Sequence, residues 1–172
     1  MTKPPSASNA SRVDVRGRRT AARVAAIQAL YEMEIGEASA ETVIDDVIVD
    51  AWRHERVPEL PRPDAAFVRS LVAGATDERA AVDRAIESAL TPPLVLDRLE
   101  AVLRAILRVA AFEILFHPDV PVKVVINEHV NVAHAFFCRQ EAAIVNAVLD
   151  RLAADARPAT IDAAPSDHGP GR

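Results

Sequence analysis

The stretch Leu94–Phe116, LVLDRLEAVLRAILRVAAFEILF, decides the fold that we expect for this chain. It contains no proline or glycine, and it is apolar except for one narrow, solvent-facing stripe that recurs every three or four residues: Asp97, Glu100, Arg104 and Arg108. A helix with so wide an apolar arc needs neighbours on two or three sides. Its charged side chains would all enter lipid, so it does not suit a membrane. We therefore predict the central helix of a soluble bundle.

Composition favours an all-α fold for the rest of the chain. Half of the 172 residues are hydrophobic but only 4% are aromatic, so the core must consist mainly of Ala, Val, Leu and Ile. No strand-like alternation accompanies them. Cys138 is the only cysteine, which excludes an internal disulfide and fits a reducing cytosol. The N-terminal residues lack the apolar segment of a signal peptide, so we expect a cytoplasmic protein.

Glycine, proline and capping residues divide the chain into about seven helices in two small subdomains. We predict a disordered N-terminal tail over residues 1–15 and a disordered C-terminal tail over 156–172. The N-terminal helical subdomain covers 16–90 and has an arginine-rich first helix, and the C-terminal helical subdomain covers 91–155. The predicted helices span about 18–35, 40–53, 64–74, 77–90, 94–116, 121–136 and 141–154.

The charge is strongly polarised along the chain. Six basic side chains and one acidic side chain give residues 1–23 a net charge of +5, so the remainder carries −10 within the overall −5. Such a molecule meets a polyanion with one end only. Because a duplex carries a charge every ~1.7 Å, the acidic body argues against a long duplex footprint and favours a short single strand.

The basic end contains the cluster Arg16–Arg23, RGRRTAAR, at the predicted start of the first helix. Cations there oppose the helix dipole. Free backbone N–H groups and arginine forks at the same place would suit phosphates, and arginines also stack on bases. The pattern indicates binding of single-stranded nucleic acid, with a solvated, charged helix flank as the alternative.

Other candidate chemistry is weak. His129 and His134 are five residues apart, roughly 140° around a helix, so we expect no metal site. We predict that His129 is a hydrogen-bonded core histidine and that His134 is exposed. Cys138 lies one turn after His134 but has no third orienting group. With no Gly-rich phosphate loop either, we predict no catalytic residue, no cofactor and no enzyme.

Several motifs resemble one family in order along the chain. They are RRTAARVAAIQALYEME (18–34), FVRSLVAGA (67–75), ILRVAAFEIL (106–115), DVPVKVVINEHVNVAHAFF (119–137) and IVNAVLDRLA (144–153). The ordered combination of A-x-Q-A-L-Y, P-x-K-V-x-I-N-E and V-N-x-V-L-D is specific, whereas no single motif is. The chain resembles the transcription antitermination factor NusB family over roughly residues 16–154.

This resemblance implies a NusB-like helical bundle that binds rather than catalyses. The expected partners are single-stranded boxA RNA of ribosomal operons, a small-subunit ribosomal protein acting as NusE, and the RNA polymerase antitermination complex. The family's RNA surface maps onto Arg16, Arg18, Arg19, Arg23, Gln28, Phe136, Arg139 and Gln140. Tyr31 matches a position at the partner-protein surface. Some relatives self-associate through the RNA face, so a homodimer is a further expectation to test.

The chain departs from the family in its last helix. Where the family often has Lys-Phe-Val-Asn-Gly, residues 143–147 read AIVNA, which removes one phosphate contact and one stacking ring. Two alternatives stand beside an antitermination factor: a helical scaffold that binds only protein, and an accessory domain related to RNA-modifying enzymes. NusB-like domains also head ribosomal-RNA cytosine methyltransferases, but we expect the enzyme alternative to fail because no catalytic domain follows before Arg172.

Overall fold

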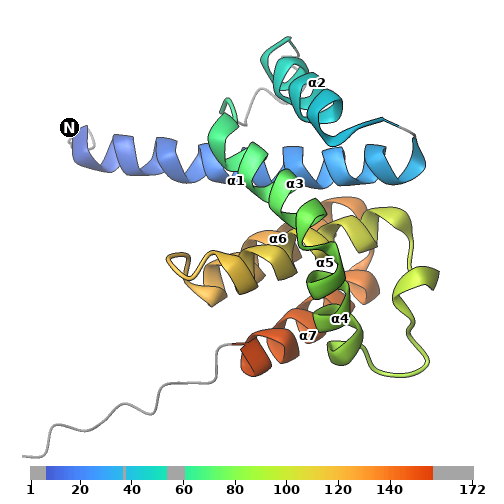
Figure 1. The fold of residues 1–172 in the computed structure, drawn as a ribbon. Coiled ribbons are helices and arrows are strands. Elements are labelled where there is room, and N and C mark those ends of the chain that lie inside the picture. The colour runs from blue at the N-terminus through green and yellow to red at the C-terminus, as the bar shows by residue number, and fades with distance from the viewer. Residues whose placement is uncertain (1–6, 37, 54–60, 157–172) are drawn as a thin grey trace, which may run out of the picture.

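The computed structural model describes residues 7–36, 38–53 and 61–156, with only the helical backbone described for 7–14 and 50–53. These residues form seven α-helices and one short 3-10 helix, with no strand among them (Figure 1). The all-α prediction is therefore confirmed. The elements are α1 (Ala7–Ile35), α2 (Ala40–Arg53), α3 (Ala65–Asp77), α4 (Arg79–Ala89), η1 (Leu96–Arg98), α5 (Ala101–Phe116), α6 (Val122–Phe136) and α7 (Arg139–Ala156).

α5 is the central helix, as its apolar arc predicted. Eleven of its 16 residues are buried, and it packs against α1, α3, α4, α6 and α7. Ile106, Leu107 and Ile114 have no exposed surface. Among the helices in the described ranges, none combines the length and the apolar character needed to cross a membrane.

The predicted helix over 94–116 is wrong at its N-terminal end. Leu96–Arg98 forms the separate 3-10 turn η1, and the backbone at Leu99 is extended with ψ of 154°. Leu96 and Leu99 are both buried, at 1% and 9% exposure. Burial of these two leucines in the core thus overrides local helix propensity. The Arg104 side chain donates hydrogen bonds to the carbonyls of Asp97 and Leu99, which compensates the broken helical pattern.

The predicted disordered tail is also wrong in part, because α1 begins at Ala7 and continues through Gly17. Glycine lowers helix stability, yet Gly17 lies within the helix. In the structure Pro61 packs against Gly17, and a Cβ on that glycine would lie 2.8 Å from Pro61 Cγ. The glycine therefore permits a close approach rather than ending a helix. The tail beyond Ala156 and residues 54–60 lie outside the described residues.

α1 runs across the bundle and joins its parts (Figure 1). It packs against α2, α3 and α5 and also contacts α6. Small residues permit this close packing, because Ala22, Ala26 and Ala29 are completely buried. α6 and α7 pack against each other and against α5. Within a single turn of α1, some residues therefore face the core and others face solvent.

An aromatic group, which we define as Phe67, Phe112, Phe116 and His117, joins α3 to the end of α5. Phe112 and Phe116 are stacked with ring centroids 5.1 Å apart, and His117 meets the edges of Phe112 and Phe67 at 5.5 and 5.7 Å. Gly74 on α3 lies directly against this group. A Cβ at Gly74 would be only 2.0 Å from Phe112 Cζ.

Candidate nucleic-acid interface

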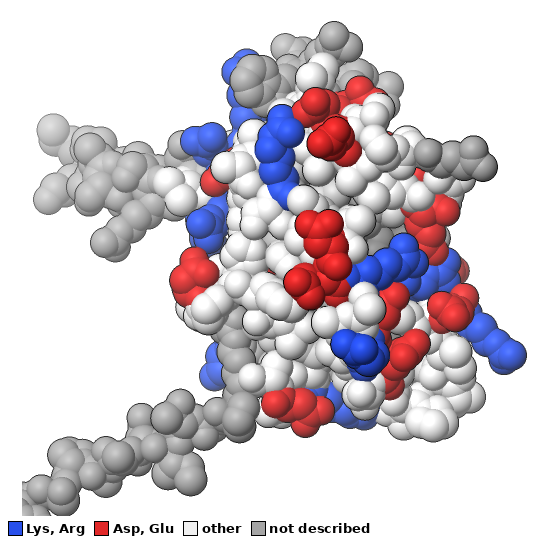
Figure 2. Space-filling view, viewed as in Figure 1, with Lys and Arg blue, Asp and Glu red and all other residues white. Residues whose placement is uncertain are grey.

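The arginines of the basic cluster lie in the interior of α1, because the helix begins well before them. Backbone N–H groups there are used by the helix itself. The expectation that free N–H groups help to hold a phosphate is therefore wrong for this chain. Any anion at this surface must be bound by the guanidinium groups. On the face drawn in Figure 2, acidic and basic side chains are mixed, with several basic ones along the left edge.

The structure separates these arginines by burial. Arg16 and Arg18 are exposed, Arg19 is half-buried, and Arg23 retains 3% of its surface. Residues 16, 19 and 23 recur every three or four positions and therefore share one face of α1. The arginines of this cluster thus do not form one exposed basic surface, because their exposure decreases from Arg16 to Arg23.

Arg23 is held by a carboxylate in the core. Its Nε donates to Glu113 Oε2 at 2.9 Å and its Nη2 to Glu113 Oε1 at 2.5 Å. Glu113 has no exposed surface. If Arg23 moved away to bind another anion, the Glu113 carboxylate would remain buried without a partner, which is unfavourable. Arg23 therefore has a structural role in the core, and its contact with RNA stays a prediction.

Arg19 lies over an aromatic ring. Its guanidinium carbon is 4.6 Å from the centroid of Phe67, within the range of a cation–π interaction. Phe67 is positioned by Asp64, which caps α3 by accepting a hydrogen bond from the Phe67 N–H at 3.1 Å. The Asp64 N–H in turn donates to the carbonyl of Arg18 at 3.2 Å. The start of α3 and the arginine segment of α1 are thus fixed to each other.

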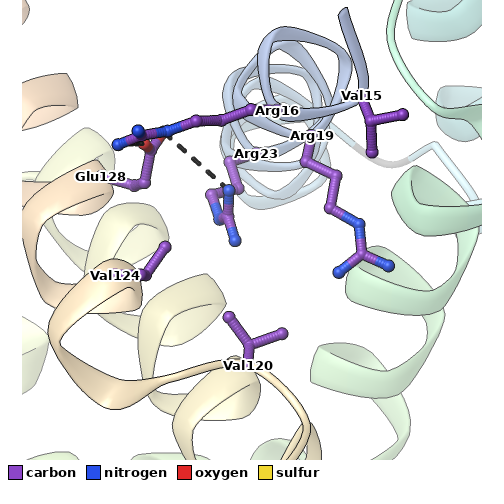
Figure 3. Close-up of a pocket in the computed structure, with 7 residues that line it drawn as sticks. All are labelled: Val15, Arg16, Arg19, Arg23, Val120, Val124 and Glu128. Carbon is purple, nitrogen blue, oxygen red and sulfur yellow. Dashed lines mark ion pairs between the residues drawn. The ribbon is translucent and has the colours of Figure 1, made fainter. Parts of the chain in front are cut away.

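A pocket of about 350 Å³ opens between the first part of α1 and α6 (Figure 3). It is lined by Val15, Arg16, Arg19, Arg23, Val120, Val124 and Glu128. Arg16 and Arg19 could bind an anionic group in this cavity, above the buried Arg23, and the valines provide apolar contact. The pocket also contains a carboxylate, Glu128, which the sequence patterns did not mark as a site residue.

Glu128 is almost buried and makes three contacts to α1. Its Oε2 accepts a hydrogen bond from the Thr20 hydroxyl at 2.6 Å and lies 3.9 Å from Arg23 Nη1. Its Oε1 lies 3.8 Å from Arg16 Nη2. The signal in the sequence was the I-N-E motif itself, because a carboxylate next to apolar helix positions needs a partner.

The second predicted contact group lies at the turn between α6 and α7. Phe136 is 58% exposed, and Arg139 and Gln140 are exposed. No interaction found among the described residues links these three side chains to the arginines of α1. On α1 itself, Gln28 is exposed and donates to Glu32 at 2.8 Å, whereas Tyr31 is half-buried against the core.

The departures from the family signature line a second pocket, of about 340 Å³. Its lining consists of Thr91, Leu94, Gln140, Ala143, Ile144, Ala147, Val148 and Arg151. Ala143 and Ala147 are exposed, while Ile144 is half-buried. Small side chains at these two positions therefore border a hollow on the surface of α7.

His129 is completely buried, as predicted, and its Nδ1 donates to the carbonyl of Val125 at 2.9 Å. Burial lowers the pKa of His129 below its ordinary value, against an opposing effect of the Glu113 carboxylate. His134 is exposed, also as predicted, and Cys138 is exposed. Across the described ranges, no group of three or more His, Cys, Asp or Glu residues could hold a metal ion.

The polar stripe predicted over 94–116 is solvent-facing only in part: Asp97 and Glu100 are exposed, as predicted, whereas Arg104 is half-buried and Arg108 is buried. Arg108 is only 6% exposed. It donates to Asp83 of α4 at 2.8 Å and to Glu34 of α1 at 2.9 Å, and Arg104 donates to the same Glu34 at 2.7 Å. Burial alone would lower the pKa of Arg108, but the hydrogen bonds and charges of Asp83 and Glu34 together raise it.

Comparison with known proteins decides the family, because the NusB family model matches residues 20–154. The chain belongs to the NusB family. Transcription antitermination protein NusB of Maricaulis maris (strain MCS10) is 45% identical over 146 residues, which cover 81% of this chain and 88% of that protein. The family resemblance of the sequence motifs is thus confirmed.

Solved NusB structures have the same fold. A T. maritima NusB crystal structure is 26% identical with a TM-score of 0.68, covering 81% of this chain and 93% of that one. A chain from a crystal structure of antitermination factors NusB and NusE in complex with dsRNA is 22% identical, also with a TM-score of 0.68. That match covers 80% of this chain and 97% of the other. The predicted NusB-like helical bundle is therefore confirmed.

Proposed function

We propose that this NusB-family chain is an RNA-binding transcription antitermination factor. It binds boxA RNA of ribosomal operons together with a small-subunit ribosomal protein acting as NusE, and it acts on elongation by RNA polymerase. Two observations support the partners: a relative at 45% identity is named a transcription antitermination protein, and one structural neighbour was crystallised with NusE and RNA. In this proposal the protein acts in the cytoplasm by binding its partners, and it has no catalytic residue.

The single observation that carries the RNA-binding proposal is the position of Arg16, Arg18 and Arg19. Arg16 and Arg18 are exposed, and Arg19 is half-buried over Phe67 beside the pocket. Guanidinium groups in this arrangement can contact successive phosphates of a strand. Arg23 anchors α1 beneath them through Glu113.

The remaining predicted contacts complete the proposed surface. Phe136 offers an exposed ring on which a base can stack. Arg139, Gln140 and Gln28 are exposed polar side chains that can bind phosphates or base edges. Tyr31 remains the proposed contact with the ribosomal protein. The neighbouring complex contains dsRNA, whereas the acidic body of this chain favours a single strand, so both forms belong in the binding experiment.

The test is a fluorescence-anisotropy titration of boxA RNA, single-stranded and duplex, with and without the ribosomal protein. Arg16→Ala with Arg18→Ala should weaken binding. It should also reduce the slope of log K against log salt by roughly 0.7 for each phosphate of the single strand that the variant no longer binds. The matched control is Arg84→Ala with Arg98→Ala, which removes two exposed arginines elsewhere.

The control variant should keep most of the affinity and the whole slope, since it changes net charge equally. Thermal melts accompany each titration. Unchanged RNA binding in a folded Arg16→Ala/Arg18→Ala variant would contradict the proposed interface. Absence of RNA binding by the unsubstituted chain, with binding of the ribosomal protein retained, would favour the protein-only scaffold.

A further inference from the structure

A negative charge sits inside the arginine-lined pocket between α1 and α6. The Glu128 side chain is 11% exposed, and its Oε2 is fixed by the hydroxyl of Thr20 at 2.6 Å. Figure 3 shows Glu128 at the side of the pocket, with Arg16 extending toward it and Arg19 pointing away from it. The carboxylate and the arginines therefore border the same space.

Glu128 is not needed to neutralise the buried arginine. Arg23 makes both of its short hydrogen bonds with Glu113, at 2.9 and 2.5 Å, whereas Glu128 lies 3.9 Å from it. Arg23 and Glu113 thus form a neutral unit by themselves. The other cation near Glu128 is Arg16, whose side chain is 79% exposed.

The Arg16–Glu128 pair is long and mostly solvated. A distance of 3.8 Å to a side chain that is 79% exposed describes a weak ion pair that solvent screens strongly. The carboxylate is held by Thr20, so it stays in place when Arg16 moves. An anion arriving in the pocket therefore meets a fixed negative charge and a movable positive one.

We propose that Glu128 is an internal competitor of RNA phosphate at this pocket. This inference rests on the proposed RNA-binding function and adds a specificity-determining residue to it. In the free protein Glu128 pairs weakly with Arg16, and a phosphate that binds this arginine must displace the carboxylate and lie beside its fixed charge. An isolated anion gains little from such an exchange. A strand that also reaches Arg18 and Arg19 gains enough contacts to bind, so Glu128 favours a polyanionic strand over single phosphate groups.

The test uses Glu128→Gln in the full chain, because glutamine keeps the shape and can still accept the Thr20 hydrogen bond. We expect single-stranded boxA RNA to bind about three- to tenfold more tightly, since a fixed like charge leaves the pocket. The matched control is Glu87→Gln on α4, an exposed position where the net charge changes equally. It should change affinity far less.

Arg16→Ala in both backgrounds separates a local competition from a general charge effect. Without Glu128 the arginine is available at once, so Arg16→Ala should cost more affinity in Glu128→Gln than in the unsubstituted chain. Glu128→Asp moves the carboxylate back by one methylene, so its RNA affinity should lie between those of the unsubstituted chain and Glu128→Gln. It also serves as the second comparison if the glutamine variant does not fold.

The failure of this inference differs from failure of the proposed function. Equal or weaker RNA binding by folded Glu128→Gln and Glu128→Asp, with the unsubstituted chain still binding, would overturn the competition alone. Additive effects of Arg16→Ala and Glu128→Gln would overturn it as well. Failure of the unsubstituted chain to bind RNA would instead remove the function on which the inference depends.

Discussion

Arg23 of α1 and Glu113 of α5 form a buried ion pair with two hydrogen bonds, 90 positions apart in the sequence. The pair fixes the arginine segment of α1 to the most buried helix of the bundle. It also divides one basic sequence cluster into a structural arginine and several ligand-accessible ones. Stability and RNA binding should therefore respond to different substitutions within the same eight residues.

The buried pair gives the first prediction. Arg23→Ala leaves the Glu113 carboxylate buried without its partner and should cost about 3–5 kcal/mol of unfolding free energy. Urea denaturation followed by circular dichroism measures this loss. Arg18→Ala, at an exposed position of the same helix, should stay within about 0.5 kcal/mol. An Arg23→Ala protein of normal stability with weakened RNA binding would show that Arg23 is a direct contact after all.

The close approach of α3 and α5 gives the second prediction. A Cβ at Gly74 would lie 2.0 Å from Phe112 Cζ, and the ring is held by Phe116 and His117. Gly74→Ala should therefore destabilise the fold by about 1–3 kcal/mol, as overpacking does. Phe112→Leu should relieve the clash, so the double variant should be more stable than the two single losses predict. Strict additivity in thermal melts would argue against the contact.

His129 gives the third prediction, a dependence of stability on pH. Its pKa in the folded protein is lowered, mainly by burial, so the unfolded chain takes up a proton first as pH falls below about 6.5. The folded state therefore loses stability between pH 6.5 and the lower folded pKa, by at most about 1.4 kcal/mol per pH unit. Denaturant titrations from pH 7.5 to 5.5 measure this.

His129→Gln removes the titrating group and should flatten that slope over the same interval. His134→Gln, on the exposed side of α6, serves as the matched control and should keep the slope of the unsubstituted chain. A slope that persists in His129→Gln would assign the pH dependence to other groups.

Phe136 gives the fourth prediction, at the end of α6 away from the arginine pocket. The ring is 58% exposed, so Phe136→Ala should leave the melting temperature nearly unchanged. Removal of a ring on which a base stacks should weaken single-strand binding by about 1–3 kcal/mol. Val95→Ala, at a position 48% exposed before η1, is the comparison for loss of exposed apolar surface. Equal RNA affinity in both variants would remove Phe136 from the interface.

Much of the fold could be predicted from the spacing of hydrophobic residues and from the glycines and prolines that end helices. The wide apolar arc identified α5 as the central helix, and glycines and prolines separated the other elements in the right order. Periodicity assigns a residue to a face but does not say what covers that face. Arg104 and Arg108 look solvent-facing along the helix, yet Glu34 and Asp83 from other helices cover them. Such long-range pairing lay beyond the local pattern.

The candidate site was predictable only in outline. The density of arginine marked the right segment of α1, and the family resemblance supplied its ligand. Neither could show that Arg23 points into the core, because its partner Glu113 lies in a helix that reads as almost wholly apolar. A lone carboxylate in such a helix indicates a buried cation as its partner.

The ring beneath Arg19 has a consequence for binding entropy. A free arginine side chain loses up to about 2 kcal/mol of rotamer freedom when it is immobilised. Arg19 already rests 4.6 Å above Phe67, so part of that ordering takes place when the protein folds and not when a ligand arrives. Phe67, which is 6% exposed, can therefore strengthen the binding of a phosphate by Arg19 without contacting the phosphate itself.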